Sequence, residues 1–194
     1  MLQNGLFYVL LYRSVQCALM DELTNLIELA QKGDKEAYGK IYQLFYKRIL
    51  RYCQFNLYDH QKAQDVCQET FLKAWKSLPT FQFRKGGSFQ AFLFRIAHNQ
   101  IVDLARKKRE ISLGLVEEPR IGADLDEAIS KGEQIKQVQS ALSELRKEER
   151  QIIILRYFEE MTGAEVAKII GKREGALRVQ THRILKKLKE ILEK

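Results

Sequence analysis

Proline is nearly absent from this sequence, and this absence is the feature that most constrains the fold. Only Pro79 and Pro119 interrupt the 194 residues. Proline lacks a backbone donor and breaks helix interiors, so long stretches without it can run as continuous helix. The same stretches are rich in Leu, Ile, Ala, Glu, Lys, Gln and Arg, which favour helix. We therefore expect an all-α chain.

Apolar residues recur with helical spacing in four segments between residues 20 and 109. Gly33 is placed to end the first segment, and Asp34, Asp59 and Ser88 are placed to cap the next three helices. The expected inward stripes of these three helices comprise Ala37, Ile41, Leu44, Phe45 and Ile49, then Ala63, Val66, Thr70, Phe71, Ala74 and Leu78, then Phe89, Phe92, Ile96 and Leu104. The pattern predicts an N-terminal four-helix domain over residues 20–109.

The charge of the chain is unevenly distributed. Residues 20–109 carry 16 Lys/Arg against 9 Asp/Glu, residues 110–135 carry 2 against 7, and residues 136–194 carry 14 against 9. The acidic stretch 110–135 also contains Gly114, Pro119 and Gly122 and lacks helical periodicity, so we expect it to be a flexible linker. Two basic domains joined by this linker indicate that both face a polyanion. The alternative is a soluble basic protein without such a partner.

The cysteines argue against a disulfide framework or a zinc site. Cys17, Cys53 and Cys67 are odd in number and form neither a CxxC motif nor a Cys/His cluster. Free thiols are typical of the reducing cytoplasm, which is where we expect this protein. The sequence also lacks HExxH, a Gly-rich phosphate loop and a Ser/Cys–His pairing, so we expect no metal, no cofactor and no catalytic activity.

The first nineteen residues differ from the rest. The apolar run at 6–12 is too short to span a bilayer, and no basic residue precedes it as a signal peptide would require. Met20 opens a more ordinary cytosolic start, so we expect residues 1–19 to be an extension from a mis-assigned start. A membrane-touching N-terminal segment is the alternative.

The C-terminal stretch 161–192 has the pattern of a helix-turn-helix. Thr162 and Glu165 have capping-box spacing, and Gly171 can form the turn between a short apolar helix and a basic second one. The second helix of such a motif enters the major groove of DNA. We expect its DNA-binding residues to be Lys172, Arg173, Glu174, Arg178, Gln180, His182 and Arg183. A solvated basic face on an ordinary helical hairpin is the alternative.

Three segments together resemble the extracytoplasmic-function (ECF, group IV) sigma factors, the small promoter-specificity subunits of bacterial RNA polymerase. They are DVCQETFLKAWKSLPTF (65–81), FQAFLFRIAHNQIVDLARKKR (89–109) and the helix-turn-helix within 141–190. The resemblance implies two small helical domains, sigma region 2 over 20–109 and sigma region 4 over 136–194. It departs at His98, where the family commonly has Arg, and at Lys172, Arg173, Gln180 and Thr181 in the recognition region.

The resemblance also implies partners and residue roles. Asp65, Gln68, Glu69 and Lys73 would bind the RNA polymerase core; without the resemblance, they would be a solvated helix face. Phe89 and Asn99 resemble the residues that hold a flipped base of the −10 element, although a core role for Phe89 is the alternative. Arg95, Arg106, Lys107 and Arg109 would follow phosphates of the opening duplex. The helix-turn-helix would read the −35 element, and an anti-sigma factor, either membrane-bound or not, would control the protein.

The sequence thus predicts a sigma factor that starts transcription at specific promoters in a stress or extracytoplasmic response. A conventional helix-turn-helix regulator that binds duplex DNA without polymerase is the alternative from another class. The stretch 65–109 disfavours it, because such a regulator needs no helix for single-stranded DNA.

Overall fold

The computed structural model describes residues 21–57, 59–83, 88–111 and 133–193. Residues 21–31 are helical, followed by α2 (Lys35–Leu57), α3 (His60–Ser77), the 3₁₀ turn η1 (Leu78–Thr80), α4 (Phe89–Ile111), α5 (Glu133–Ser143), α6 (Lys147–Ile153), the π-helical η2 (Ile154–Phe158), α7 (Gly163–Ile170) and α8 (Glu174–Leu192). Among the described residues there is no strand, which confirms the all-α fold class. Within them, no helix is both long and apolar enough to cross a membrane.

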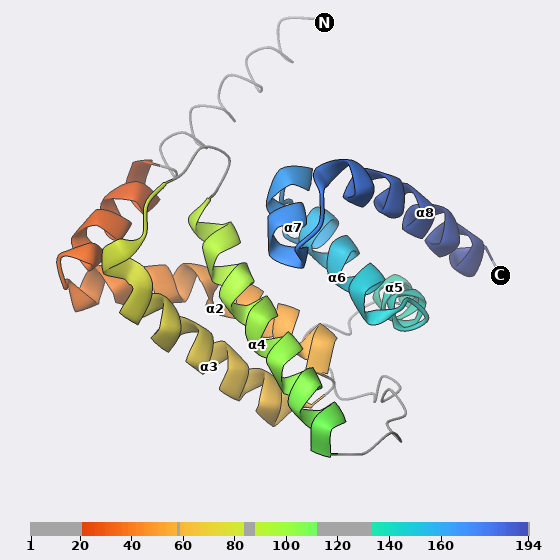
Figure 1. Cartoon of the computed structure of the whole chain (residues 1–194), viewed down its shortest axis with the longest axis horizontal. Helices are drawn as coiled ribbons and strands as arrows, with labels where there is room; N and C mark the ends of the chain where they lie inside the picture. Colours follow the sequence, from red (N-terminus) through yellow and green to blue (C-terminus); the bar gives the residue numbers. More distant parts are fainter. Residues whose placement is uncertain (1–20, 58, 84–87, 112–132, 194) are drawn as a thin grey trace, which may run out of the picture.

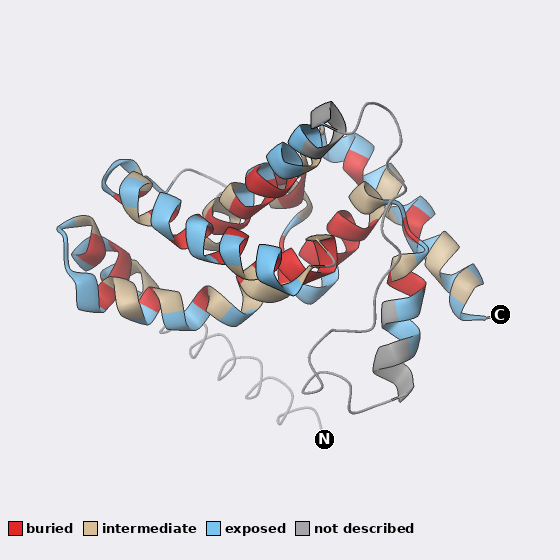
Figure 2. Ribbon diagram, turned by 90° about the horizontal axis from the view of Figure 1, so that it is seen from below, coloured by how far each residue is buried: buried red, intermediate tan, exposed pale blue. Residues whose placement is uncertain are grey.

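The first four helices form an N-terminal lobe around an aromatic and aliphatic core (Figure 1). Helices α2, α3 and α4 pack against one another, and Tyr52 and Phe94 lie fully buried between them with ring centroids 5.3 Å apart. The Tyr38 hydroxyl donates to the Phe71 carbonyl at 2.5 Å and ties α2 to α3. The ribbon coloured by burial shows the buried residues on the facing sides of these helices (Figure 2).

The predicted helix starts in this lobe are confirmed. The Asp34 carboxylate accepts from the backbone N–H of Ala37 at 3.0 Å, and Asp59 accepts from that of Lys62 at 3.0 Å. The Ser88 hydroxyl accepts from the backbone N–H of Ala91 at 3.1 Å. These side chains satisfy donors that have no partner within the first helical turn, so each fixes where its helix begins.

The last four helices form a C-terminal lobe that contains the predicted helix-turn-helix, α7 and α8. Thr162 and Glu165 make the predicted capping box at the start of α7. Gly171 ends α7 with a φ of 77°, the left-handed conformation that glycine adopts without strain. Leu177 and Ile184 bury one side of α8, as expected, whereas Ala176 is exposed.

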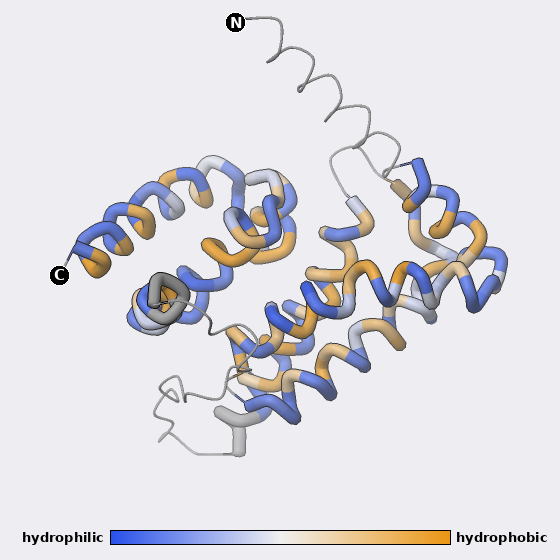
Figure 3. Tube along the Cα trace, turned by 180° about the vertical axis from the view of Figure 1, so that it is seen from behind, coloured by the Kyte–Doolittle hydropathy of each residue, from blue (hydrophilic) through white to orange (hydrophobic). Residues whose placement is uncertain are grey.

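The two lobes contact each other through α4 and α7 (Figure 1). Seen from behind, apolar residues line the interior of each lobe, and polar residues cover most of the outside (Figure 3). Cys53 and Cys67 are free thiols buried in the N-terminal lobe.

Two residues expected in the apolar stripes are instead exposed. Leu44 on α2 is 56% exposed and Leu104 on α4 is 39% exposed. Both lie beside buried residues of the same helix, at the edge of the strip that the neighbouring helices cover. Residues 1–19 and most of the predicted linker 110–135 lie outside the described residues.

Candidate nucleic-acid interface

The four residues predicted to bind polymerase share one exposed face of α3. Asp65, Gln68, Glu69 and Lys73 are all exposed, and the Lys73 ammonium lies 3.7 Å from the Glu69 carboxylate. The opposite face of α3 carries the predicted apolar stripe, which is buried. Leu72, 55% exposed, lies beside them in the sequence and adds an apolar side chain to this polar helix.

A second surface runs along α4. Residues 97, 98, 100 and 101 face inward, and the Gln100 amide donates to the Thr70 hydroxyl of α3 at 2.8 Å, which fixes the rotation of the helix. Residues spaced by three and four on the other side are therefore exposed, namely Arg95, Asn99, Asp103, Arg106 and Lys107. The Arg106 guanidinium lies 3.4 Å from the Asp103 carboxylate. Arg109 belongs to α4, but its side chain lies outside the described part of the chain.

The expectation that Phe89 walls a flipped base needs correction. Phe89 is 1% exposed and packs against Phe45, Phe81 and Phe92, with ring centroids 5.3–5.9 Å away. It also begins α4, about 15 Å along the helix axis from Asn99 at 1.5 Å per residue, too far for both to hold one base. The core alternative therefore holds for Phe89. Phe83, which precedes α4 and packs on Phe81, is 50% exposed.

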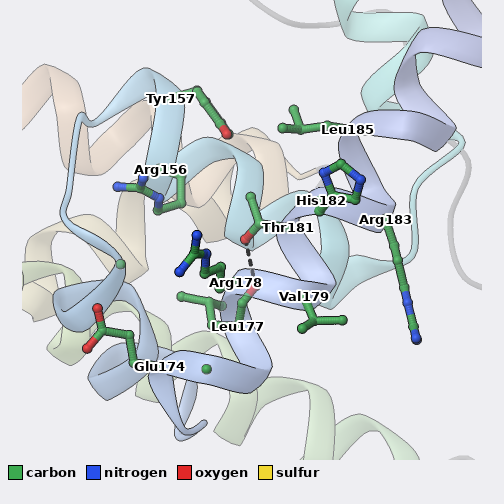
Figure 4. Close-up of a pocket in the computed structure, with 12 residues that line it drawn as sticks. Arg156, Tyr157, Glu174, Leu177, Arg178, Val179, Thr181, His182, Arg183 and Leu185 are labelled. Atoms are coloured by element: carbon green, nitrogen blue, oxygen red, sulfur yellow. Dashed lines mark hydrogen bonds between the residues drawn. The ribbon is translucent and has the colours of Figure 1, made fainter.

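The third surface is a groove of about 870 Å³ on the helix-turn-helix, lined by α8 and by residues of η2 (Figure 4). Arg178, His182 and Arg183 of α8 line this groove, and Glu174 closes one end beside Gly163. The Thr181 hydroxyl donates to the Leu177 carbonyl at 2.8 Å, so this residue is turned back onto its own helix. The exposed predicted residues are Arg173, Glu174, Arg178, His182 and Arg183.

Two of the predicted DNA-binding residues are bound within the lobe instead. Lys172 donates to the Glu148 carboxylate of α6 and to the Gln180 amide oxygen at 2.7 Å, and Gln180 donates to Glu148 at 2.8 Å. Burial alone would raise the pKa of Glu148, but these two hydrogen bonds lower it below its ordinary value. Lys172 and Gln180 thus link α6 to α8, and their assignment to DNA contacts is not supported by this arrangement.

The groove also contains residues that the sequence pattern did not single out. Arg156 and Tyr157 come from η2, and the Arg156 guanidinium lies 5.9 Å from the centre of the Tyr157 ring. Val179 and Leu185 of α8 are 53% and 39% exposed and give the groove an apolar part. Arg156 and Tyr157 precede the helix-turn-helix in the sequence. The structure shows that they line the same groove as residues of α8.

Charged residues also join the two lobes. Glu159, just after η2, has a fully buried side chain that lies 2.7 Å from the Arg48 Nε and 2.8 Å from an Arg51 Nη atom of α2. The Gln90 amide of α4 donates to the Glu159 carbonyl at 2.7 Å, and the Ser88 hydroxyl donates to the Glu165 carboxylate at 2.5 Å. A burial pattern of this kind is not visible in the sequence, where Glu159 and Glu160 look alike.

Both lobes match known families. Residues 41–111 match Sigma-70 region 2, and residues 135–188 match Sigma-70, region 4, so that the two matches cover more than half of the chain. The ECF RNA polymerase sigma factor BldN of Streptomyces coelicolor is 26% identical over 174 residues, which cover 88% of this chain and 66% of BldN. The ECF RNA polymerase sigma factor SigW of Bacillus subtilis is 27% identical over 169 residues, which cover 81% of this chain and 89% of SigW.

Solved structures show the same arrangement of helices. CnrH, in complex with the cytosolic domain of CnrY, superposes with a TM-score of 0.63 at 25% identity, covering 87% of this chain and 95% of CnrH. The sigma factor RpoE from Bartonella quintana, in complex with the anti-sigma factor NepR, shares the fold with a TM-score of 0.69 at 24% identity, covering 80% and 96%. With both sigma regions in order and ECF relatives along most of its length, the chain belongs to the ECF RNA polymerase sigma factors, which direct RNA polymerase to promoters to initiate transcription.

Proposed function

We propose that this protein is a group IV ECF sigma factor in which residues 20–109 dock on the polymerase core and open the −10 element, while residues 136–194 read the −35 element as duplex. The observation that carries this proposal is the presence of three separate exposed surfaces, on α3, α4 and α8, in the two matched sigma regions. The acidic linker 110–135 would pass near the polymerase active-site channel, where its charge could mimic nucleic acid.

On the N-terminal lobe, Asp65, Gln68, Glu69 and Lys73 would contact the polymerase, with the exposed Leu72 as an apolar contact beside them. Asn99 would bind an unstacked base of the −10 element through its amide, and Arg95, Arg106, Lys107 and Arg109 would follow the phosphates. Phe83, half exposed near the N-terminal end of α4, would supply a stacking surface for a different base from the one that Asn99 binds.

On the C-terminal lobe, Arg178, His182 and Arg183 would meet base edges and phosphates from α8, and Arg173 and Glu174 would contact DNA at its N-terminal end. Arg156 and Tyr157 would extend this contact from the opposite wall of the groove (Figure 4).

Regulation would follow the solved relatives. CnrH and RpoE were both solved with a partner, the cytosolic domain of CnrY and the anti-sigma factor NepR. An anti-sigma factor, either membrane-bound or not, would accordingly hold this protein inactive in the cytoplasm and release it in response to stress.

Run-off transcription tests the proposal. Purified bacterial core polymerase, this protein and a fragment of its own upstream DNA should give a discrete transcript. Asn99→Ala should reduce the transcript about tenfold, the loss expected when one base contact worth about 1.4 kcal/mol is removed. Neutralising the α3 surface with Asp65→Asn and Glu69→Gln should reduce the transcript and weaken binding to core polymerase.

Matched variants separate these roles from general charge effects. Glu28→Gln with Glu36→Gln removes two exposed carboxylates elsewhere on the N-terminal lobe and should leave the transcript unchanged. Arg178→Ala should weaken −35 binding, whereas Lys47→Ala, an exposed cation on α2, should not. Sequence-specific duplex binding without polymerase, together with no transcript from any genomic fragment, would favour the conventional regulator instead.

A further inference from the structure

Arg48 and Arg51 of α2 and Gln90 of α4 form a group of donors on the face of the N-terminal lobe that looks toward the C-terminal lobe; we call it the arginine cradle. Arg48 Nε and one Arg51 Nη atom donate to the two carboxylate oxygens of Glu159 at 2.7 and 2.8 Å. Arg48 and Gln90 also donate to the Glu159 carbonyl, at 3.3 and 2.7 Å. Four donors from two helices therefore converge on a single residue of the other lobe.

The cradle has more donors than Glu159 uses. Arg51 Nε is buried and has no hydrogen-bond partner among the described residues. The Arg48 and Arg51 side chains are 34% and 36% exposed, whereas that of Glu159 is fully buried. Two guanidinium groups and an amide suit an anion with three or more acceptor oxygens, and a phosphate has these whereas a carboxylate has two.

The position of the cradle indicates which phosphate it would bind. On the proposed function, the C-terminal lobe binds the −35 element and the N-terminal lobe binds the −10 element. The DNA between them must run from one lobe to the other, and in the proposed arrangement the cradle, uncovered when the lobes separate, faces this DNA. Asn99 faces away from Gln90 on α4, since residues nine apart differ by about 180° around a helix. The cradle is thus separate from the surface assigned to the −10 base.

We propose that the arginine cradle binds a backbone phosphate of the duplex spacer between the −35 and −10 elements, and that Glu159 occupies this site in the free protein. This inference rests on the proposed function. In the free chain, the Glu159 carboxylate competes with DNA for the cradle and holds the lobes together. In the holoenzyme on a promoter, the lobes separate, Glu159 leaves, and Arg48 and Arg51 contact the DNA backbone.

The first test uses the free full-length chain and a 30-bp duplex of arbitrary sequence, because a phosphate site does not read bases. Binding is measured by fluorescence anisotropy over a range of salt concentrations. Glu159→Gln should bind about tenfold tighter than the wild type, and its affinity should fall more steeply with salt, by about 0.9 in the log–log slope for each phosphate gained. Glu160→Gln, which removes the neighbouring exposed carboxylate, is the matched control and should change little.

A combined variant assigns the gain to the cradle. In Glu159→Gln with Arg48→Ala and Arg51→Ala, affinity and salt slope should return to wild-type values. If Glu159→Gln and Glu160→Gln strengthen binding equally, or if the gain survives loss of both arginines, the proposal is wrong and Glu159 is only a structural clamp. A gain found with single-stranded but not with duplex DNA would also overturn it.

The second test uses the holoenzyme on the promoter found by run-off transcription. Arg48→Ala with Arg51→Ala should lose the transcript at a lower salt concentration than Lys40→Ala with Lys47→Ala, two exposed cations of the same helix. Glu159→Gln should transcribe like the wild type, because Glu159 has left the cradle in that complex. If the wild type transcribes and both double variants behave alike, the cradle proposal fails while the sigma-factor function stands. If the wild type yields no transcript, the proposed function itself fails.

Discussion

The interior of each lobe and the contact between the lobes are built from different chemistry. Inside the N-terminal lobe, Tyr52, Phe94 and Ile101 lie in an apolar core, and each is fully buried. Between the lobes, apolar contacts such as that of Phe55 with Phe158, whose ring centroids lie 6.2 Å apart, are joined by hydrogen bonds and ion pairs, and the arginines that hold Glu159 remain partly exposed. Apolar burial stabilises permanently folded units, whereas polar interdomain contacts are typical of units that separate. The difference indicates two stable lobes with a separable contact.

The largest expected effect comes from opening the apolar core. Phe94→Ala should reduce the free energy of unfolding by about 3–5 kcal/mol, because a buried ring is replaced by a cavity. Denaturant unfolding followed by circular dichroism measures this change. Val102→Ala on the exposed side of α4, where Val102 is 46% exposed, should stay within about 0.5 kcal/mol of the wild type. Equal losses for both variants would contradict the division into core and surface.

A buried cation inside the C-terminal lobe should have the next largest effect. Arg150 donates to the carbonyls of Leu142, Ser143 and Leu145 at 2.8–3.2 Å and so closes the C-terminal end of α5, and at 3.4 Å it also donates to the Phe55 carbonyl of α2. Burial lowers the pKa of Arg150 to about 10, which is still well above neutral pH, so the guanidinium stays charged. The carbonyls that accept its hydrogen bonds offset the cost of burying this charge.

Arg150→Met should therefore cost about 2 kcal/mol in the free energy of unfolding, since three buried carbonyls lose a charged donor. Lys186→Met on the exposed side of α8 removes the same charge and should be nearly neutral. Hydrogen exchange of α5 amides should rise in the first variant alone. If Arg150→Met is as stable as the control, Arg150 does not hold α5.

These contrasts also show what a single sequence can predict. The caps at Asp34, Asp59, Ser88 and Thr162 and the turn at Gly171 are local features, so spacing along the chain was sufficient to find them. The prediction that Leu44 and Leu104 are buried was wrong. Helical periodicity predicts which residues share a face of a helix, but not how wide a strip of that face the neighbouring helices cover.

The candidate surfaces were predictable only where one helix supplies them. The exposed faces of α3 and α4 agree with the sequence pattern. Phe89, Lys172 and Gln180 do not, because their partners come from other helices. Glu159 could not be found at all, since its partners Arg48 and Arg51 lie more than 100 residues away in the chain.

The contact between the lobes should be the most sensitive to salt. The Arg48 and Arg51 side chains that pair with the buried Glu159 are about one-third exposed, so dissolved salt weakens these ion pairs more than it weakens the apolar cores. Raising the salt concentration should therefore increase the radius of gyration in small-angle X-ray scattering without loss of helical circular dichroism. Glu159→Gln should already be expanded at low salt, while Glu160→Gln should follow the wild type. A radius that is independent of salt in every variant would argue for a permanent contact.

The smallest expected effect concerns His98, which belongs to the N-terminal core but lies near charges of the other lobe. Its Nδ1 is 3.3 Å from the Tyr52 hydroxyl. Burial and, after it, the charge of Lys147 lower the pKa of His98 below its ordinary 6.5, and Glu148 partly opposes this. The folded protein thus binds this proton more weakly than the unfolded chain does. Stability should be complete above pH 6.5 and fall as the pH drops below it.

Replacing the imidazole ring of His98 tests this pH dependence. It also tests whether His98 belongs to the N-terminal core or to the contact between the lobes. His98→Gln should flatten the decline in the free energy of unfolding below pH 6.5, whereas His182→Gln on exposed α8 should preserve it. Because burial is the largest cause of the shift, Glu159→Gln should keep most of the decline even with its lobes apart. If the decline vanishes in Glu159→Gln, Lys147 of the opposite lobe dominates instead, and His98 belongs to the contact rather than to the core.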